Sequence, residues 1–312
     1  MTKLGASTLD VSALCLGGNV FGWTADKETS FAVLDAYTAA GGNFIDTADS
    51  YFWRKPGNSG GESETIIGAW MAARGNRDDV VVATKVGSWP SHPGLSAHNI
   101  AEATEGCLRR LGVDHIDLLY AHKDDEGAAQ EETLDAFDAL VTAGKVRVLG
   151  ASNFTAERLR SSLEISARDG LARYEVLQPH YNLVERADYE ASLAPLLASE
   201  GISCVPYYAL AQGFLTGKYR EGGPAVESVR SQGATAYLDD QGRAVLAVLD
   251  EIAAGHDVAV AAVALAWLAA QPTVAAPIAS ARTVEQLGAL LQGMALTLTD
   301  DEIRLLSHVS AP

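Results

Sequence analysis

The feature that most constrains the fold is a long alternation of short apolar runs with longer segments of helical period. This alternation favours parallel strands joined by crossover helices. Eight apolar runs are predicted as strands, at about 13–17, 43–46, 80–85, 115–121, 146–150, 174–178, 202–206 and 273–277. Helices are expected between and after them, at about 29–40, 62–74, 97–111, 131–143, 155–169, 187–199, 258–270 and 283–292. Eight such units predict an α/β protein with a closed (β/α)8 TIM barrel.

The structural alternative is an open, doubly wound sheet. That fold usually has a G-x-G-x-x-G turn after its first strand, and residues 17–22 (Gly-Gly-Asn-Val-Phe-Gly) lack this spacing. The length of 312 residues also suits one barrel. We therefore predict a single barrel domain over residues 1–312.

Three segments fall outside the minimal repeat. Residues 3–16 contain two short extended pieces that could form a hairpin before the first core strand. The glycine-rich segment 212–237 is predicted as a long loop at the rim, followed by an additional helix at 239–255. The capping-box spacing from Thr299 to Glu302 predicts a terminal helix.

Composition excludes several classes of partner. The chain has 23 Lys and Arg against 40 Asp and Glu, a net charge of −17 that repels nucleic acid and anionic membranes. Its three cysteines are widely spaced and suggest neither a disulfide nor a metal site. The N-terminus lacks the apolar core of a signal peptide, and the longest apolar run, 258–270, is too short to span a bilayer. A cytoplasmic protein is expected, and the oligomeric state is not predicted.

Ionisable residues follow three successive predicted strands. Asp46 ends one strand and is followed by Tyr51, Lys85 ends the next, and His122 follows the third. Barrel chemistry occurs at this edge. A lysine about 4 Å away could lower a tyrosine pKa by two to three units in a medium of low dielectric. Asp46 would keep Lys85 charged, and His122 could donate a hydrogen bond to a carbonyl oxygen, so the sequence predicts a site that protonates an oxygen.

These residues and their flanking motifs resemble the aldo-keto reductase family over nearly the whole chain. The matching segments are Gly42–Ala48 with Tyr51, Gly61–Glu64, Ala83–Lys85, Gly150–Phe154, Gln178–Asn182 and Tyr207–Tyr219. The resemblance implies a (β/α)8 barrel that reduces an aldehyde or ketone with a nicotinamide cofactor, usually NADPH. Asp46, Tyr51, Lys85 and His122 would be the catalytic residues, with Tyr51 as the general acid.

The resemblance also implies a cofactor cleft. Its expected residues are Asn19, Ser152, Asn153, Gln178, Tyr207, Leu210, Gln212, Gly213, Lys218, Ser280, Arg282 and Gln286. Ser280 and Arg282, near a helix start, favour the 2′-phosphate of NADPH. Ala279 and Ser280 replace a proline and a glycine frequent in related sequences, and Leu290 stands where an adenine-binding asparagine is often found.

The substrate is expected to be a small carbonyl compound in an aromatic cleft. The residues predicted to line that cleft are Phe21, Trp23, Phe52, Trp53, Trp89 and Tyr208. Arg54 and Lys55, in the insert 54–60, could meet an anionic substrate group.

The same residues are also compatible with purely structural roles and with two other functions. Ser152 and Asn153 could simply cap a helix, Gln178 could satisfy backbone groups, and Tyr207 could pack the barrel. Lys85 could instead form a Schiff base, as in an aldolase. A third possibility is a non-catalytic, NADPH-binding redox sensor.

Overall fold

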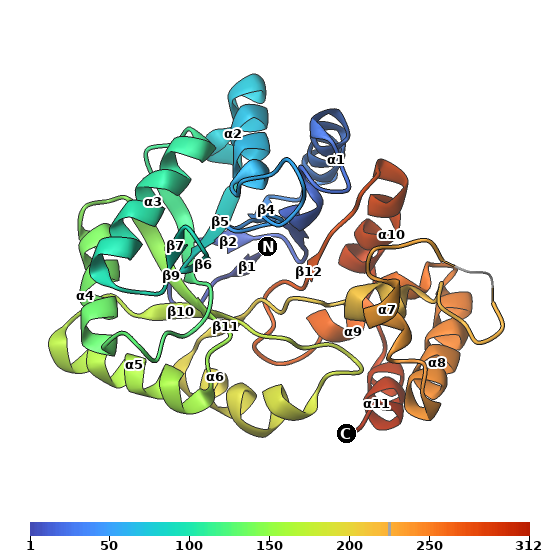
Figure 1. Cartoon of the computed structure of the whole chain (residues 1–312). Coiled ribbons are helices and arrows are strands. Elements are labelled where there is room, and N and C mark those ends of the chain that lie inside the picture. Colours follow the sequence, from blue (N-terminus) through green and yellow to red (C-terminus); the bar gives the residue numbers. More distant parts are fainter. Residues whose placement is uncertain (224–225) are drawn as a thin grey trace.

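A single sheet of eight parallel strands forms the centre of the molecule. The computed structural model describes residues 1–223 and 226–312. The strands are β3 (Cys15–Gly17), β4 (Phe44–Asp46), β5 (Val81–Val86), β8 (Ile116–Ala121), β9 (Val146–Ser152), β10 (Tyr174–Gln178), β11 (Ser203–Cys204) and β12 (Ile278–Ala279). Their order in space is β11-β10-β9-β8-β5-β4-β3-β12. Figure 1 shows them curling around a common centre, which confirms the predicted barrel.

The eighth strand lies later in the chain than predicted. The expected run 273–277 is not the assigned strand, which is Ile278–Ala279 and pairs with β3. Val274 instead forms a parallel bridge with Cys204, and the Ala275 amide donates to the Cys204 carbonyl at 2.8 Å. Pro277 lies between these two pairings and has no amide hydrogen to donate, so it interrupts the ladder.

Helices surround the sheet on its outer side (Figure 1). They are α1 (Lys27–Ala39), α2 (Glu62–Arg74), α3 (Ala97–Leu111), α4 (Gln130–Thr142), α5 (Ala156–Asp169), α6 (Ala194–Glu200), α9 (Val260–Ala269) and α10 (Val284–Ala295). The helix predicted at 187–199 differs from expectation, because its first part is a π-helical turn, η3 (Tyr189–Leu193), that leads into α6. Short 3-10 turns follow β3 at η1 (Gly18–Val20) and precede β5 at η2 (Arg77–Asp79).

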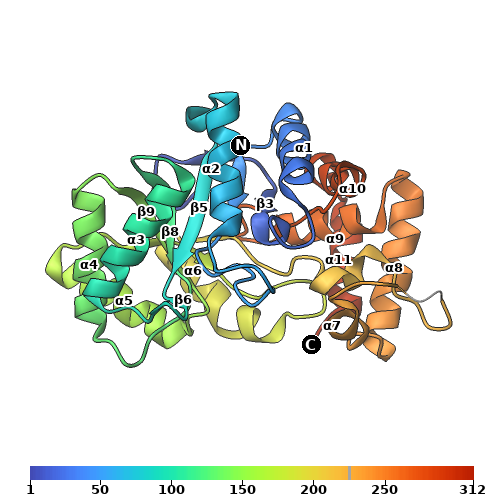
Figure 2. The same ribbon diagram turned by 45° about the horizontal axis from the view of Figure 1, so that its top comes forward.

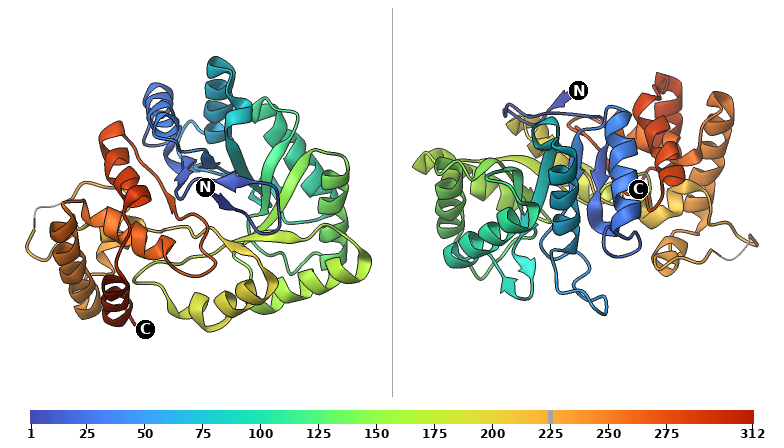
Figure 3. Two further views of the ribbon diagram at one scale, coloured as in Figure 1. Left: turned by 180° about the vertical axis from the view of Figure 1, so that it is seen from behind. Right: turned by 90° about the horizontal axis from the view of Figure 1, so that it is seen from above.

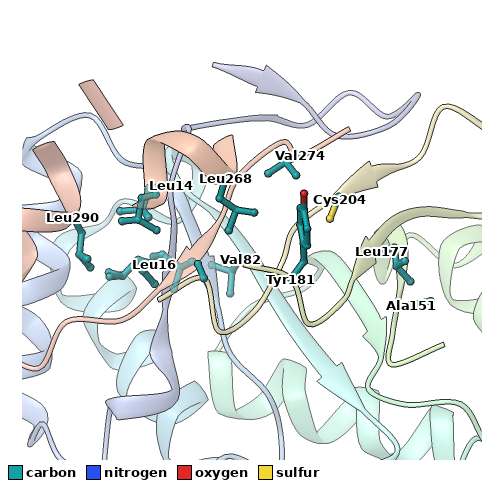
Figure 4. Close-up of a cluster of buried hydrophobic side chains, with 14 of the residues drawn as sticks. Leu14, Leu16, Val82, Ala151, Leu177, Tyr181, Cys204, Leu268, Val274 and Leu290 are labelled. Atoms are coloured by element: carbon teal, nitrogen blue, oxygen red, sulfur yellow. The ribbon is translucent and has the colours of Figure 1, made fainter. Parts of the chain in front are cut away.

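Alternate strand residues belong to two separate apolar cores, because successive side chains of a strand point to opposite faces. Leu16, Val82 and Leu177 belong to the larger core between sheet and helices, which also includes Leu268 of α9 and Leu290 of α10 (Figure 4). Their neighbours in the chain fill the barrel interior. The interior residues are Cys15, Phe44, Val81, Ala83, Leu118, Tyr120, Val148, Val176, Val205, Ala275, Ala276 and Ile278.

An N-terminal hairpin closes one end of the barrel. Strands β1 (Thr2–Lys3) and β2 (Asp10–Val11) pair antiparallel, as the sequence predicts. Leu4, Leu9 and Val11 of this hairpin pack into the interior core. The view from above in Figure 3 places the hairpin at one end of the barrel, and the loops around residues 50–60 and 88–93 at the other.

That second end carries the longer connections. They include the hairpin of β6 (Ser88–Trp89) and β7 (His92–Pro93), the turn η4 (Ala211–Thr216) and the short helix α7 (Ser231–Thr235). The predicted loop 212–237 is thus partly helical, and its residues 224 and 225 lie outside the described part.

Two further helices pack together beside the barrel: α8 (Asp240–His256) and α11 (Asp300–Val309) (Figures 1 and 2). The predicted capping box is present, since the side chains of Thr299 and Glu302 each bond the other's backbone amide. Within the described residues no single helix has the length and apolarity to cross a membrane, although α8 and α9 meet that test as a pair bent by 99°.

Candidate active site

The strand register brings Asp46 and Lys85 to one level of the barrel. Asp46 pairs with Ala83 of β5, so Lys85 lies two residues further along and its side chain points to the same interior face. Both side chains are buried, with 1% of each residue exposed. The alternation of β4 and β5 therefore places a carboxylate and an ammonium together at the C-terminal end of the strands.

Lys85 is the centre of a dense hydrogen-bond network. Its Nζ donates to Asp46 Oδ1 and Oδ2 at 2.7 and 2.6 Å, and to the Thr47 carbonyl at 2.8 Å. It also donates to the Tyr51 hydroxyl at 2.7 Å, while that hydroxyl donates to Asp46 Oδ2 at 2.9 Å. The three side chains thus form a closed triangle with Tyr51 nearest the cavity.

The expected lowering of the Tyr51 pKa is contradicted. Burial and the Asp46 carboxylate raise the pKa of Tyr51 well above its ordinary value. The physical reason is that Asp46 neutralises Lys85, so the ion pair offers little net attraction to a phenolate while burial still penalises it. Tyr51 is therefore a neutral hydroxyl, the form that can give up a proton.

His122 stands across from Tyr51 as a neutral imidazole. The ring centroids are 6.2 Å apart at an interplanar angle of 80°. Its backbone amide donates to the Val86 carbonyl at 2.9 Å, which fixes the residue to the end of β5. Burial, with the charges of Lys85 and Lys123, lowers the pKa of His122 to about 3. A neutral imidazole can still donate one hydrogen bond into the cavity.

Three residues predicted for the cofactor cleft, Ser152, Asn153 and Gln178, form hydrogen bonds within the site. Gln178 Nε2 donates to Asp46 Oδ1 at 2.9 Å, and Ser152 Oγ donates to the Gln178 carbonyl at 2.9 Å. Asn153 Nδ2 donates to the His122 carbonyl at 2.9 Å, and Asn153 Oδ1 accepts from the Tyr207 hydroxyl at 2.9 Å. Gln178 is thus tied to the Asp46–Lys85 pair, a link that sequence reasoning did not predict.

A cavity of about 590 Å³ opens above this network. Tyr51, His122 and Asp46 line one part of it, together with Ser152, Asn153, Gln178, Tyr207 and Tyr208. Another part is lined by Asn19, Leu210, Gln212, Gly213, Lys218, Ser280, Arg282, Gln286 and Leu290. The structure therefore brings all twelve residues predicted for the cofactor into the wall of one cavity.

Backbone geometry shapes the wall between these two parts. Ala211, Gln212 and Gly213 have positive φ angles of 45°, 58° and 99° in η4. Such angles are uncommon for residues other than glycine and cluster at functional sites. Ser280 Oγ also donates to Asn19 Oδ1 at 2.7 Å, which joins the end of β12 to the end of β3.

Positive charge dominates the cavity wall. Lys218, Arg230 and Arg282 line it, and Asp46, the one acidic residue among its described lining residues, is already paired with Lys85. None of the three cations forms an ion pair with any residue in the described parts of the chain. Three uncompensated cations in a chain of net charge −17 fit an anionic ligand.

Comparison with known proteins gives the family. The Aldo/keto reductase family profile matches residues 13–311. The chain belongs to the aldo-keto reductase family. It is 36% identical over 311 residues to norsolorinic acid reductase stcV of Emericella nidulans, covering 94% of this chain and 76% of that protein. It is 34% identical to the uncharacterized oxidoreductase YrpG of Bacillus subtilis, covering 99% and 95%.

A third relative is named as a channel subunit and not as an oxidoreductase. The chain is 34% identical to a probable voltage-gated potassium channel subunit beta of Oryza sativa, over 91% of this chain and 88% of that protein. Aldo-keto reductases generally use nicotinamide cofactors and reduce carbonyl groups, and membership supports an oxidoreductase of this general kind.

Four of the six aromatic residues predicted to line the substrate cleft of this aldo-keto reductase are outside the cavity wall. Phe21 is buried in the apolar core, Phe52 stacks on Trp23, Trp53 packs against Arg54, and Trp89 packs against Arg110. Trp23 and Tyr208 do line the cavity. Three of these rings contact neighbouring side chains. A position just beyond a strand end therefore does not determine whether a side chain points into the cavity.

The insert 54–60 also differs from expectation. Lys55 Nζ donates to the carbonyls of Gly22 and Trp23 at 3.0 and 2.9 Å, and neither Arg54 nor Lys55 is among the lining residues. The insert braces the loop that carries Trp23, and its ammonium is not presented to a ligand.

Several lining residues were not singled out from the sequence. They are Gly17, Thr24, Ala209, Ser228, Val229, Arg230, Ala259, Ala261, Ile278, Ala279 and Ala289. Arg230 is the one charged residue among them. An isolated arginine in a glycine-rich loop gives no local signal of its direction, although the sequence predicts the loop 212–237 at the rim.

Proposed function

We propose that this aldo-keto reductase reduces an aldehyde or ketone to an alcohol with NADPH, and that Tyr51 is the general acid. The observation that carries the proposal is the buried triangle of Asp46, Lys85 and Tyr51 at the floor of a cavity with an uncompensated positive wall. The first feature is suited to delivering a proton to an oxygen, and the second to holding a phosphorylated cofactor.

The residues of the cavity divide into three groups that fit such a cofactor. Ser280, Arg282 and Gln286 surround the start of α10 and would hold a 2′-phosphate, because hydroxyl, guanidinium and helix-start groups bind phosphate well. Lys218 and the positive-φ turn of η4 would hold the diphosphate. Tyr207, Ser152, Asn153 and Gln178 would hold the nicotinamide, which supplies a hydride when it is bound in reduced form.

Tyr51 would deliver the proton. Its hydroxyl turns from Asp46 Oδ2 towards the carbonyl oxygen of the substrate, while the Lys85 ammonium continues to donate to Tyr51 Oη. As the proton leaves, that ammonium stabilises the phenolate in a site of low dielectric. His122, neutral and opposite Tyr51, would orient the carbonyl by a hydrogen bond.

The bonding of Lys85 argues against a Schiff-base mechanism. A lysine nucleophile needs a free, unprotonated amine. Here the ammonium donates to the Asp46 carboxylate, the Thr47 carbonyl and the Tyr51 hydroxyl, so no position is left for a substrate carbon.

The first experiment follows NADPH absorbance at about 340 nm with purified protein and a panel of aldehydes, ketones, quinones and keto sugars. The proposal expects oxidation of NADPH with at least one class of carbonyl compound, and little oxidation of NADH.

Replacing Arg282 by Gln should weaken NADPH binding by roughly 10- to 100-fold and NADH binding much less, because only NADPH carries the 2′-phosphate.

Arg304→Gln is the matched control, since Arg304 lies on α11 and pairs with Asp301. Similar kcat/KM for the two cofactors would contradict the choice of NADPH. Tight NADPH binding with no turnover of any carbonyl class would favour the non-catalytic sensor instead.

A further inference from the structure

Arg230 has no role in the mechanism above, yet its side chain lies in the cavity wall. It is the residue directly before α7, in the long loop that follows β11. The loop segment 228–230 lines the same cavity as Tyr51 and His122.

Hydrogen bonds hold the backbone around Arg230 in place. Its amide donates to Ser228 Oγ at 3.3 Å, and its carbonyl accepts from the Ala234 amide at 3.0 Å. Gly233 packs so tightly on Gln212 that a Cβ there would lie 2.2 Å from Gln212 Oε1. Helix α7 thus packs against η4, and this packing sets the backbone position of Arg230.

The guanidinium lies over Trp23, at 5.7 Å from the ring centroid. Trp23 in turn stacks on Phe52, next to Tyr51, with ring centroids 3.5 Å apart. This contact places Arg230 on the side of the cavity that carries Trp23, one of the two predicted substrate-cleft aromatics that line it. Lys218 and Arg282 are left for the phosphates of the cofactor.

Arg230 is also a cation without a counterion in the described parts of the chain. It forms no ion pair there, and its guanidinium donates to no carboxylate. Burial lowers the pKa of Arg230, and the charge of Arg282 adds to the effect. A partly desolvated guanidinium gains most from an anion that arrives with the ligand, because a charge-assisted, bidentate pair replaces the water it has lost.

We propose that Arg230 selects carbonyl substrates that carry an acidic oxygen group, such as a carboxylate, which it binds beside Trp23. This inference rests on the proposed carbonyl reduction and adds a substrate class to it. An aryl or alkyl body would contact Trp23 and Tyr208, its carbonyl would face Tyr51 and His122, and its acidic group would pair with Arg230.

The test compares 4-carboxybenzaldehyde with methyl 4-formylbenzoate, which has nearly the same shape and no charge. The wild type should show a kcat/KM at least roughly ten-fold higher for the acid. Arg230→Gln should lower kcat/KM for the acid by roughly 10- to 100-fold, mainly through KM, and change the ester less than about three-fold. Arg230→Lys should retain part of the preference.

Arg243→Gln is the control, because Arg243 lies on α8 and pairs with Asp240 and Glu221 away from the cavity. Equal kcat/KM for acid and ester in the wild type would overturn the inference. So would an equal loss for both aldehydes in Arg230→Gln with a matching rise in the Kd of NADPH, which would assign Arg230 to the cofactor diphosphate.

A binding measurement separates this inference from the proposed function. Isothermal titration of 4-(hydroxymethyl)benzoate and its methyl ester into the NADP+-loaded protein needs no turnover. Preferential binding of the acid that Arg230→Gln abolishes supports the anion site even if neither aldehyde is reduced. Equal, Arg230-independent binding of the two compounds contradicts it even if both aldehydes are reduced.

Discussion

At the scale of single residues, the protonation states in the site follow from burial more than from sequence neighbours. Burial in the cavity wall, with the positive charges of Lys85 and Lys123, lowers the pKa of His122 to about 3. Tyr51 stays protonated because burial and Asp46 disfavour its phenolate. Both groups are therefore neutral in the range where the enzyme is expected to work.

A direct prediction concerns the titration of His122. The 13Cε1 resonance of His122, assigned by its loss in His122→Gln, should show no titration step between about pH 5 and 8, because the imidazole already lacks its second proton above about pH 3. A step near pH 6.5, the value of an unperturbed histidine, would contradict this environment.

The convergence of the candidate site residues was predictable from the sequence, but their electrostatics were not. Asp46, Lys85 and His122 each follow an apolar run, and the common edge of parallel strands brings such positions together. The sign of the Tyr51 shift depends on Asp46 bonding both Lys85 and Tyr51, a contact that spacing alone cannot reveal.

At the scale of elements, the N-terminal hairpin completes the barrel core. Leu4 is fully buried and packs among interior strand residues. Its hairpin lies at the end of the barrel opposite the loops around residues 50–60 and 88–93 (Figure 3). The Gly5 amide donates to Ser203 Oγ at 2.8 Å, which attaches the hairpin to β11. Its contribution should therefore be to stability and only weakly to catalysis.

Leu4→Ala tests this separation. The free energy of unfolding, measured by urea denaturation, should fall by roughly 2 to 5 kcal/mol, as for other buried leucines. Leu305→Ala, at a position that is 43% exposed, should change it by less than about 1 kcal/mol. A large loss of kcat/KM in folded Leu4→Ala protein would show that the hairpin also shapes the site.

Elements with strong periodicity were predicted well, and irregular ones were not. The eight helices around the barrel were all expected, but the π-helical turn η3 and the late start of β12 were not. Both exceptions depend on tertiary hydrogen bonds, such as the one from the Ile278 amide to the Pro206 carbonyl at 2.9 Å. The directions of Phe52, Trp53 and Trp89 likewise depend on side-chain contacts, here with Trp23, Arg54 and Arg110. The sequence therefore could not show whether these rings line the cavity or pack the loops.

At the scale of the whole molecule, one buried carboxylate should influence stability across the pH range. Asp49 is fully buried, and neither of its carboxylate oxygens has a hydrogen-bond partner in the described structure. Burial, with Glu64 nearby, raises the pKa of Asp49 to about 7, although Arg110 acts in the opposite direction. In the unfolded chain the pKa of Asp49 is about 4. Between about pH 4 and pH 7 the folded state therefore binds more protons than the unfolded state, so the contribution of Asp49 to stability falls as the pH rises.

Asp49→Asn should therefore stabilise the protein, and more so at high pH. The gain in the free energy of unfolding should grow by roughly 2 to 3 kcal/mol from pH 5 to pH 8. Asp35→Asn is the opposite control, because hydrogen bonds from Arg74 and Trp70 lower the pKa of Asp35. Its replacement should destabilise by a similar amount at both pH values, and a pH-independent gain for Asp49→Asn would refute the account of Asp49.

The central claim is that Tyr51 gives its proton to the substrate carbonyl, and a single-turnover measurement tests it most directly. NADPH-loaded protein is mixed with excess aldehyde, and the loss of absorbance at about 340 nm gives the rate constant of the chemical step. Tyr51→Phe should lower it by roughly 10²- to 10⁴-fold while the Kd of NADPH stays within about three-fold of wild type, because only the acid is removed. A rate constant within about ten-fold of wild type would contradict the assignment of Tyr51 as the general acid.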